Sequence, residues 1–419
     1  MFTRKPPARW ALRRWMASGR GSPSSIAILG SKLPWDTADP STREPPSTRQ
    51  VLAIHSPQKT HEPQDEPSFY SNDIDRFASK PTRPVTLQNL LQMCEPPLTR
   101  EKLLQNARYL CRERPIRYAK RVKLFQRLPF IVNSNPFINE VYRMYYRNFE
   151  ESRGFPMVET LEDHEAFIQM LTRHSDTLKH IMPQIARGFF ETRMYFGTRA
   201  RQTFLDQLIS MRISLRLLTS QHIALHNGYT NGACHSVIDR IVLGDTVRAC
   251  AQGVQTMCEM SYDSAPDFEV DGDAAAFHYI EPHLEYMVVE LLKNAFRSSL
   301  QAGQDGEIPR VLITVSKGNG KVAIRIRDHG GGIPRRIHDK IFDYAFTTVE
   351  HQDSADPAAS ETRAAEPPFA GLGFGLPMTK LYAEYFGGSL HIVSLEGYGC
   401  DAFLELPSIK VDRVPAITI

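Results

Sequence analysis

The residues Glu290–Arg297, with the sequence ELLKNAFR, decide the fold of this chain. Apolar side chains around them predict a helix over about 283–301. Because Glu290 and Asn294 are four residues apart, they lie on the same face of that helix. A carboxylate can act there as a base, and a carboxamide oxygen is a hard donor of the kind that binds Mg²⁺. Such a pair is most often only an exposed Glu/Asn pair, so its meaning depends on the segments that follow.

A glycine-rich turn follows the predicted strand 321–327 and begins at Asp328, with the sequence DHGGGIP. Three successive glycines allow the backbone to come close to a flat ligand. The Asp328 carboxylate, at the end of the strand, can accept a hydrogen bond from an amino group. An ordinary turn seldom needs three glycines, so Asp328, Gly330 and Gly332 are candidate nucleotide contacts.

A second glycine-rich loop, GLGFGLP over 371–377, lies just before a helix predicted at about 376–386. It follows a polar, Ala- and Pro-rich stretch at 350–370, which we predict to be part of a lid over a nucleotide, 345–375. Glycine amides that lead into a helix N-terminus form an anion cradle, with Pro377 in the first turn. The candidate contacts in this region are Thr347, Thr348, Gly371, Leu372, Gly373, Phe374, Gly375 and Leu376.

The order of these motifs along the chain excludes other nucleotide-binding folds. A dinucleotide-binding fold needs a strand directly before its glycines, whereas a polar loop precedes Gly371. A Walker P-loop sequence is absent. The strand 322–324 resembles the lysine-bearing strand of eukaryotic protein kinases, but it is followed by Arg325 instead of lysine. The glycine loop also comes after that strand, whereas the kinase loop comes before it.

The chain divides near 227–235, where Gly228, Asn231 and Gly232 interrupt a helical pattern. Residues 69–235 predict a helical bundle, and one apolar stripe recurs at helical spacing. That stripe consists of Phe204, Leu208, Met211, Leu215 and Leu218. Residues 236–419 predict helices on one face of a largely antiparallel sheet. Its expected strands are 268–270, 311–316, 321–327, 390–395 and 402–406. The expected fold is therefore α+β with two domains.

The first 35 residues are rich in arginine and contain no acidic residue, which is typical of a mitochondrial presequence; a disordered basic tail is the alternative. Residues 36–68 are rich in Pro, Ser, Thr and Gln and predict a disordered linker. A net charge of +3 over 419 residues argues against a nucleic-acid-binding protein, and no run of apolar residues is long enough for a transmembrane segment. Six scattered cysteines without a CxxC pair argue against structural zinc and disulfides.

Taken together, these segments resemble the Bergerat ATP-binding fold of the GHKL superfamily. Residues 290–297 resemble its N-box, 328–332 its G1 box and 371–376 its G2 box. Within that superfamily the chain resembles the mitochondrial kinases of the pyruvate and branched-chain 2-oxoacid dehydrogenase complexes. The matching segments outside the boxes are RPIRYA at 114–119, LPF at 128–130, SMRISLRLLTSQH at 210–222 and YAEYFGGSL at 382–390. The resemblance covers about residues 69–408.

The resemblance implies a four-helix-type bundle followed by a GHKL α/β-sandwich ATP-binding domain. It implies a protein-serine kinase that uses ATP and Mg²⁺ to inactivate the E1 component of such a complex. The lipoyl domain of E2 is then the docking partner, a homodimer the assembly, and the mitochondrial matrix the location.

The resemblance also assigns roles to individual residues. Glu290 is expected to be the general base, a role that contributes about 10²–10⁴ in rate. Asn294 is expected to hold Mg²⁺ on the phosphates, and Asp328 to receive the adenine amino group. The glycine loop would surround the triphosphate, with Arg297, Thr347 and Thr348 lining the site.

Some positions depart from the family pattern. Cys400 stands where the family usually has threonine, and His329 where it usually has arginine. Tyr286, one turn before Glu290, replaces the histidine of pyruvate dehydrogenase kinases and resembles the branched-chain type. The segment after the last strand ends at Ile419, too short for the crossover tail of pyruvate dehydrogenase kinase dimers. These features favour the branched-chain branch or a divergent paralogue.

Two rival functions stay open at this point. His222 lies on the bundle, where sensor histidine kinases carry their phosphoacceptor, so a histidine autokinase is one alternative. A non-catalytic ATP-binding adaptor on the E2 core is the other.

Overall fold

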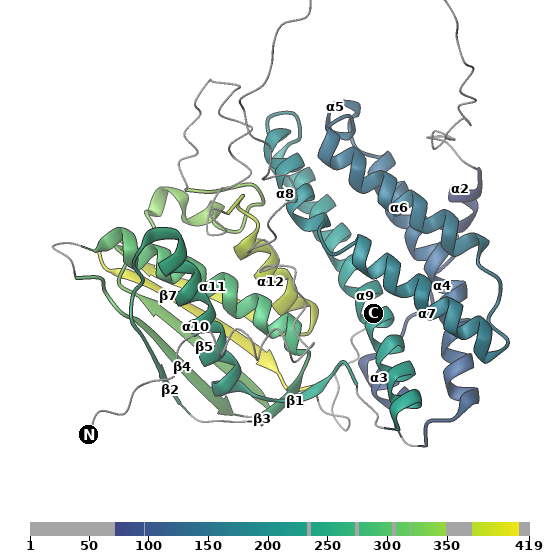
Figure 1. The fold of residues 1–419 in the computed structure, drawn as a ribbon. Helices are drawn as coiled ribbons and strands as arrows, with labels where there is room; N and C mark the ends of the chain where they lie inside the picture. Colours follow the sequence, from purple (N-terminus) through teal and green to yellow (C-terminus); the bar gives the residue numbers. More distant parts are fainter. Residues whose placement is uncertain are drawn as a thin grey trace, which may run out of the picture.

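The computed structural model describes residues 72–95, 97–232, 236–272, 276–303, 307–318, 320–348 and 371–409. They form a bundle of helices beside a sheet that is covered by helices on one face (Figure 1). The predicted presequence, the predicted linker and lid residues 349–370 lie outside the described residues. The predicted α+β fold with two domains is confirmed.

The helices of the bundle follow one another along the N-terminal half. They are α2 (Asn72–Ala78), α3 (Leu87–Met93), α4 (Arg100–Gln126), α5 (Phe130–Asn133), α6 (Pro136–Gly154), α7 (Leu161–Thr177), α8 (Ile181–Glu191) and α9 (Thr198–Asn231). Helix α4 packs against α6, α7 and α9, and α6 packs against α8. Thr99 caps α4 by accepting from the backbone N–H of Lys102, and Glu101 lies in the first turn.

Helix α9 buries four residues of the predicted apolar stripe and half-buries the fifth, Met211, but the helix ends later than expected. Gly228 lies inside the helix and is buried, and the helix ends at Asn231 with Gly232 in the left-handed conformation (φ 73°). Leu225 is buried against Leu103, and Tyr229 packs on the same cluster. This packing stabilises the last turns of the helix despite the low helix propensity of glycine.

The sheet of the C-terminal half has five strands in the order β2-β4-β5-β7-β6. Their bounds are β2 (Phe268–Asp271), β4 (Val311–Gly318), β5 (Lys321–Asp328), β6 (Ser389–Leu395) and β7 (Gly399–Pro407). Strand β2 runs parallel to β4, and the other pairs are antiparallel. All five strands predicted from the sequence are therefore present. In β5 the side chains alternate between buried and partly exposed, because one face of the sheet is covered and the other is not.

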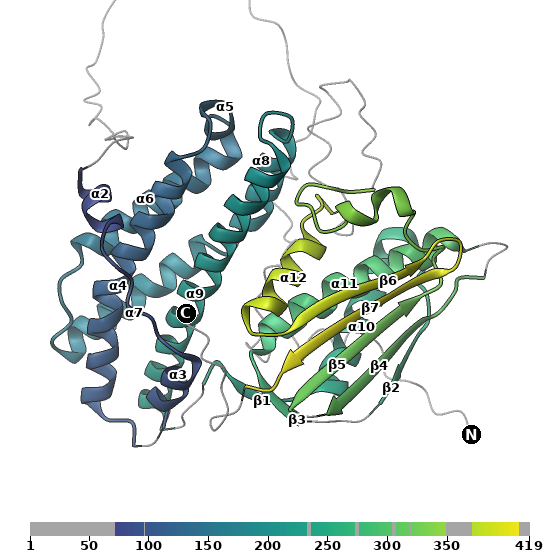
Figure 2. The ribbon, with the colours of Figure 1, turned by 180° about the vertical axis from the view of Figure 1, so that it is seen from behind.

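The helices α10 (Leu243–Tyr262), α11 (Glu281–Ala302) and α12 (Gly375–Tyr385) lie on one face of this sheet (Figure 1). The opposite face carries no helix of the described residues (Figure 2). A short 3₁₀ helix, η2 (Arg335–Lys340), follows the first glycine-rich turn. The sequence pattern does not predict α10, nor a separate two-stranded sheet formed by β1 (Asp239–Val242) and β3 (Ala276–Tyr279).

The two halves of the chain meet along α9. Helix α12, which begins at the second glycine loop, packs against α9, and one continuous set of buried apolar side chains extends from the bundle to the sheet. No helix among the described residues is long and apolar enough to cross a membrane. The second glycine-rich loop therefore lies close to the bundle as well as to the sheet.

Candidate functional site

A pocket opens between α11 and the ends of β5 and β7. It is lined by Leu291, Asn294, Ala295, Ser298, Ile326, Asp328, Gly332, Ile333, Leu376, Ile392, Cys400 and Ala402. Most of these side chains are apolar, whereas Asp328 contributes a carboxylate on the strand side and Asn294 an exposed carboxamide on the helix side. Such a lining suits a flat, mostly apolar ring with one polar edge. The segments that the sequence analysis singled out do meet here.

Asp328 is held as an acceptor at the buried side of the pocket. It is only 6% exposed, and its Oδ1 accepts from the backbone N–H of Gly330 at 2.9 Å. Burial raises the pKa of this carboxyl group, and hydrogen bonds from Gly330, Ser298 and Cys400 act in the opposite direction. An exocyclic amino group can therefore donate to a fixed, partly desolvated carboxyl oxygen.

The first glycine-rich turn is shaped by its contact with the β6–β7 turn. Gly332 has φ 71°, and a Cβ there would lie 2.3 Å from the backbone oxygen of Leu395. Gly397 N–H donates to the Gly331 oxygen at 2.8 Å, and Ile333 N–H donates to Ser394 Oγ at 2.7 Å. The glycines thus allow the backbone of this turn to pack closely against the β6–β7 turn, in addition to lining the pocket.

Glu290 lies against the second glycine loop. A Cβ added at Gly375 would lie 2.5 Å from Glu290 Oε2, so the carboxylate and the loop are in direct contact. The other carboxylate oxygen, Oε1, accepts from Lys293 Nζ at 2.7 Å, and both side chains are 16% exposed. A partly buried carboxylate beside an anion-binding loop is placed to accept a proton from a group that attacks a bound phosphate.

The second glycine loop is interlocked with the segment before the lid. Gly373 has φ 74°, and its Cβ would lie 2.2 Å from the Phe346 backbone oxygen. Ala345 N–H donates to the Gly373 oxygen at 3.1 Å. Helix α12 begins at Gly375, and no side chain of the described residues caps it. Its first amides can therefore bind an anion.

The remaining predicted residues lie at the edge of this arrangement. Thr347 is half-buried and Thr348 exposed, next to the residues that contact Gly373. Arg297 is half-buried on α11, one turn after Asn294. Neither threonine nor Arg297 lines the pocket formed by the described residues.

Tyr286 and Lys293 lie on either side of Glu290 along α11. The hydroxyl of Tyr286 donates to Met378 Sδ at 3.5 Å, and its ring lies 5.2 Å from that of Tyr382. The hydrogen-bond partner of Glu290 is Lys293, which the sequence analysis had not selected. The sequence could have predicted this pair, because Glu290 and Lys293 are three residues apart and such residues are neighbours on a helix.

His222 is buried in the bundle and is 0% exposed. Its Nε2 lies 3.2 Å from Nε2 of His164, and burial lowers the pKa of His222 to about 3. A phosphoacceptor must reach the γ-phosphate of a nucleotide, which a fully enclosed imidazole cannot do. The histidine autokinase hypothesis is therefore not favoured.

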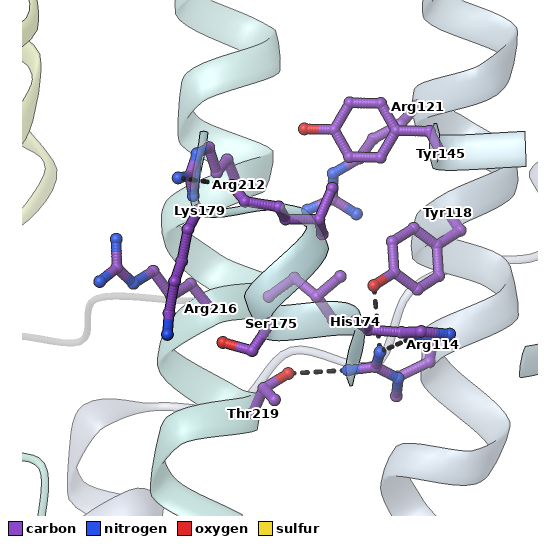
Figure 3. Close-up of a pocket in the computed structure, with 12 residues that line it drawn as sticks. Arg114, Tyr118, Arg121, Tyr145, His174, Ser175, Lys179, Arg212, Arg216 and Thr219 are labelled. Atoms are coloured by element: carbon purple, nitrogen blue, oxygen red, sulfur yellow. Dashed lines mark hydrogen bonds between the residues drawn. The ribbon is translucent and has the colours of Figure 1, made fainter. Parts of the chain in front are cut away.

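The bundle contains a second cavity, separate from the nucleotide pocket (Figure 3). Arg114 is 1% exposed and donates to Thr219 Oγ1 at 2.8 Å and to the Tyr118 hydroxyl at 3.0 Å. Arg121 and Arg212 also line the cavity. No motif indicates this cavity in the sequence, because partners such as Arg114 and Thr219 are 105 positions apart.

The sheet, the pocket with its buried carboxyl group, and the glycine loop against Glu290 define an ATP-binding protein of the GHKL type. Comparisons with known proteins agree. Residues 279–410 match the family of histidine kinase-, DNA gyrase B-, and HSP90-like ATPases, and residues 84–259 match mitochondrial branched-chain alpha-ketoacid dehydrogenase kinase.

Among curated proteins, the mitochondrial [pyruvate dehydrogenase (acetyl-transferring)] kinase of Arabidopsis thaliana is 31% identical over 83% of this chain and 97% of its own length. The human isozyme 1 of that kinase is 29% identical over 74% of each chain. Human isozyme 3 is 30% identical over 82% of this chain and 87% of its own length. The chain therefore belongs to the mitochondrial 2-oxoacid dehydrogenase kinase family, and it is an ATP-dependent protein kinase.

Proposed function

We propose that this kinase transfers the γ-phosphoryl group of Mg·ATP to a serine of the E1 component of a pyruvate or branched-chain 2-oxoacid dehydrogenase complex, and thereby inactivates the complex. One observation carries the proposal: the carboxylate of Glu290 touches the glycine loop at Gly375, beside a pocket with a buried carboxyl group. The names of the relatives supply the substrate, and their mitochondrial naming supports a location in the matrix.

The residues that hold ATP follow from the pocket. Asp328 accepts from the adenine amino group, and the amides of 371–375 surround the phosphates at the start of α12. Arg297, Thr347 and Thr348 close the site around the phosphates. The threonine of the family pattern is replaced by Cys400, whose pKa is raised to about 12 by burial. Its thiol is therefore a neutral and weak hydrogen-bond partner at the adenine end.

Mg²⁺ fits this site as an ion that is held mainly by the nucleotide. No group of three or more His, Cys, Asp or Glu side chains among the described residues could hold a metal ion. Mg²⁺ commonly binds through one or two protein ligands together with phosphate oxygens and water. The exposed carboxamide of Asn294, one turn after Glu290, is the protein ligand that we assign.

Glu290 accepts the proton of the serine hydroxyl while the serine oxygen forms a bond to the γ-phosphorus. The bond between that phosphorus and the β–γ bridging oxygen breaks, and ADP leaves. Lys293 orients the carboxylate through its hydrogen bond to Oε1. Most of the rate acceleration in such transfers comes from positioning and charge neutralisation, which the contact between Glu290 and Gly375 supports.

We also propose that the lipoyl domain of E2 docks on the bundle and that the kinase is a homodimer. The face of the sheet without helices offers a candidate dimer contact at the β6 edge (Figure 2). Val393, Leu395 and Tyr398 are exposed there by 58%, 64% and 55%. Apolar side chains gathered on an open sheet edge favour association with a second copy.

Incubation of the purified protein with Mg·[γ-³²P]ATP and each purified E1 separately tests the proposal. We expect one E1 to be labelled on serine. In Glu290→Gln the rate of labelling should fall by about 10²–10⁴-fold, with the affinity for ADP unchanged. Glu259→Gln, an exposed glutamate of α10, is the matched control and should keep full activity. Binding of ATP and of a lipoyl domain without labelling of either E1 would refute the kinase and favour the adaptor.

A further inference from the structure

We propose that Tyr344 and Asp206 form a positioning pair, through which helix α9 of the bundle holds the glycine loop against the catalytic base. Neither residue lines the nucleotide pocket formed by the described residues, so the pair acts through the loop. The inference deepens the proposed function and rests on Glu290 being the base.

Every polar group of Tyr344 is bonded to α9. Its hydroxyl donates to Asp206 Oδ1 at 2.9 Å, and its backbone N–H donates to Gln202 Oε1 at 3.5 Å. Its backbone oxygen accepts from Arg201 Nε at 3.2 Å. Tyr344 is 0% exposed and Arg201 6% exposed, so these bonds are shielded from water. A residue of the ATP-binding half is thus fixed by three side chains of one bundle helix.

Arg201 also ties this helix to the turn before it. Its Nη1 donates to the backbone oxygens of Arg193 and Phe196, at 3.3 and 3.1 Å. The start of α9 is therefore itself held in place, and it offers Tyr344 a rigid support.

From Tyr344 the contacts lead directly into the glycine loop. Its ring packs on Phe374 with 5.1 Å between centroids, and the next residue, Ala345, donates to the Gly373 oxygen. Ala345 has φ 63°, a left-handed conformation that is unfavourable for a non-glycine residue. Such a conformation persists where the surroundings over-determine it. Tyr344 on one side and Gly373 on the other provide that constraint.

The loop then meets the base. Gly375, two residues after Gly373, is in contact with the Glu290 carboxylate. A shift of about 1 Å at a catalytic group can reduce a rate by about 10²-fold. Loss of the bond between Tyr344 and Asp206 allows the loop to shift relative to Glu290, and the chemical step is the part of the reaction most sensitive to that shift.

Asp206 has no role in the proposed chemistry, yet it is kept partly buried at this contact. Burial raises the pKa of its carboxyl group, whereas the Tyr344 hydroxyl, Lys380 and Gln202 lower it. Lys380 belongs to α12, so α9 and α12 both contribute to the surroundings of this carboxylate. The Asp206 carboxylate accepts the hydrogen bond by which the Tyr344 hydroxyl is fixed to α9.

The test compares Tyr344→Phe, Asp206→Leu and Asp206→Asn with the wild-type kinase, full-length and with E1 as substrate. Tyr344→Phe removes only the hydroxyl, whereas Asp206→Leu removes the acceptor together with its interactions with Gln202 and Lys380. We expect each to lower kcat by about tenfold or more, with the Kd for ADP changed less than threefold. Asp206→Asn keeps an oxygen acceptor and should retain nearly full kcat. If Tyr344→Phe does not fold, the contrast between Asp206→Leu and Asp206→Asn carries the same test.

Tyr279→Phe is the matched control. Tyr279 is also 0% exposed, and its hydroxyl has no hydrogen-bond partner among the described residues. This variant should therefore leave kcat unchanged. A general packing defect would instead lower melting temperature, ADP affinity and kcat together.

Hydrogen–deuterium exchange supplies a readout that does not depend on activity. In Tyr344→Phe, peptides covering 371–377 should exchange faster, while peptides of α4 and α6 should not change. Unchanged exchange with full kcat would overturn the inference, and so would a loss of kcat that Asp206→Asn shares. Failure of the wild type to label any E1 would instead reject the proposed function, and the exchange result would still decide the positioning pair.

Discussion

Replacing Gly375 by alanine tests whether the glycine loop sets the position of the base. The added Cβ would lie 2.5 Å from Glu290 Oε2, whereas ordinary contacts begin at 3.4 Å, so the carboxylate must retreat by about 0.9 Å. The backbone itself tolerates the change. Gly375 is the first residue of α12 and does not have a positive φ, and alanine is the best helix former.

The expected effect falls on the chemical step. A displacement of about 1 Å at a catalytic group costs about 10²-fold in rate, which is about 2.7 kcal/mol of barrier. The end of a glutamate side chain can move without disturbing the core, so the melting temperature should stay close to that of the wild type. Asp328 is untouched, and the affinity for ADP should change only a few-fold.

The assay is the initial rate of transfer from Mg·[γ-³²P]ATP to E1 at saturating ATP, with ADP binding measured by calorimetry. Gly371→Ala is the matched control in the same loop, because the nearest atom to its added Cβ is the Gly373 nitrogen at 3.9 Å. A wild-type kcat for Gly375→Ala would refute the placement of Glu290 as a base held by this loop. An equal loss in Gly371→Ala would attribute the effect to the loop backbone instead.

Three further predictions concern the adenine end, the bundle and the sheet edge. Asp328→Asn replaces a charged acceptor by a neutral one and should weaken ADP binding by about tenfold, measured by calorimetry; an unchanged Kd would contradict the adenine assignment. The pKa of His222 is lowered to about 3 in the folded state, so the folded chain binds fewer protons than the unfolded chain below pH 6.5. The contribution of neutral His222 to the free energy of unfolding is therefore fully present above pH 6.5 and is lost as the pH falls toward 3. Between pH 7 and 5 the loss is about 2 kcal/mol. In urea titrations, the free energy of unfolding of His222→Gln should fall by about 2 kcal/mol less than that of the wild type between pH 7 and 5. An equal fall in the variant and the wild type would contradict this prediction. Leu395→Lys at the exposed edge of β6 should shift sedimentation velocity toward the monomer, whereas an unchanged dimer would place the interface elsewhere.

The sequence was sufficient for the elements with long, regular patterns. Strands β4, β5 and β7 are eight or nine residues long, so their burial alternates often enough to be recognised. The relation between Glu290 and Asn294 also needs only the helical repeat, because a spacing of four residues places both on one face. The order of the glycine-rich segments then excluded the other nucleotide-binding folds. These are local properties of the chain.

The tertiary structure decided everything that depends on residues far apart in the chain. His222 looked available on a helix, but its burial depends on the neighbouring helices of the bundle. The contact between Gly375 and Glu290 needs α12 to pack on α11. Tyr344 and Asp206 are 138 positions apart, and no periodicity relates them. The residue types and local spacings could therefore identify an ATP site, whereas the packing of α9 against α12 determines which side chains surround the second glycine-rich loop.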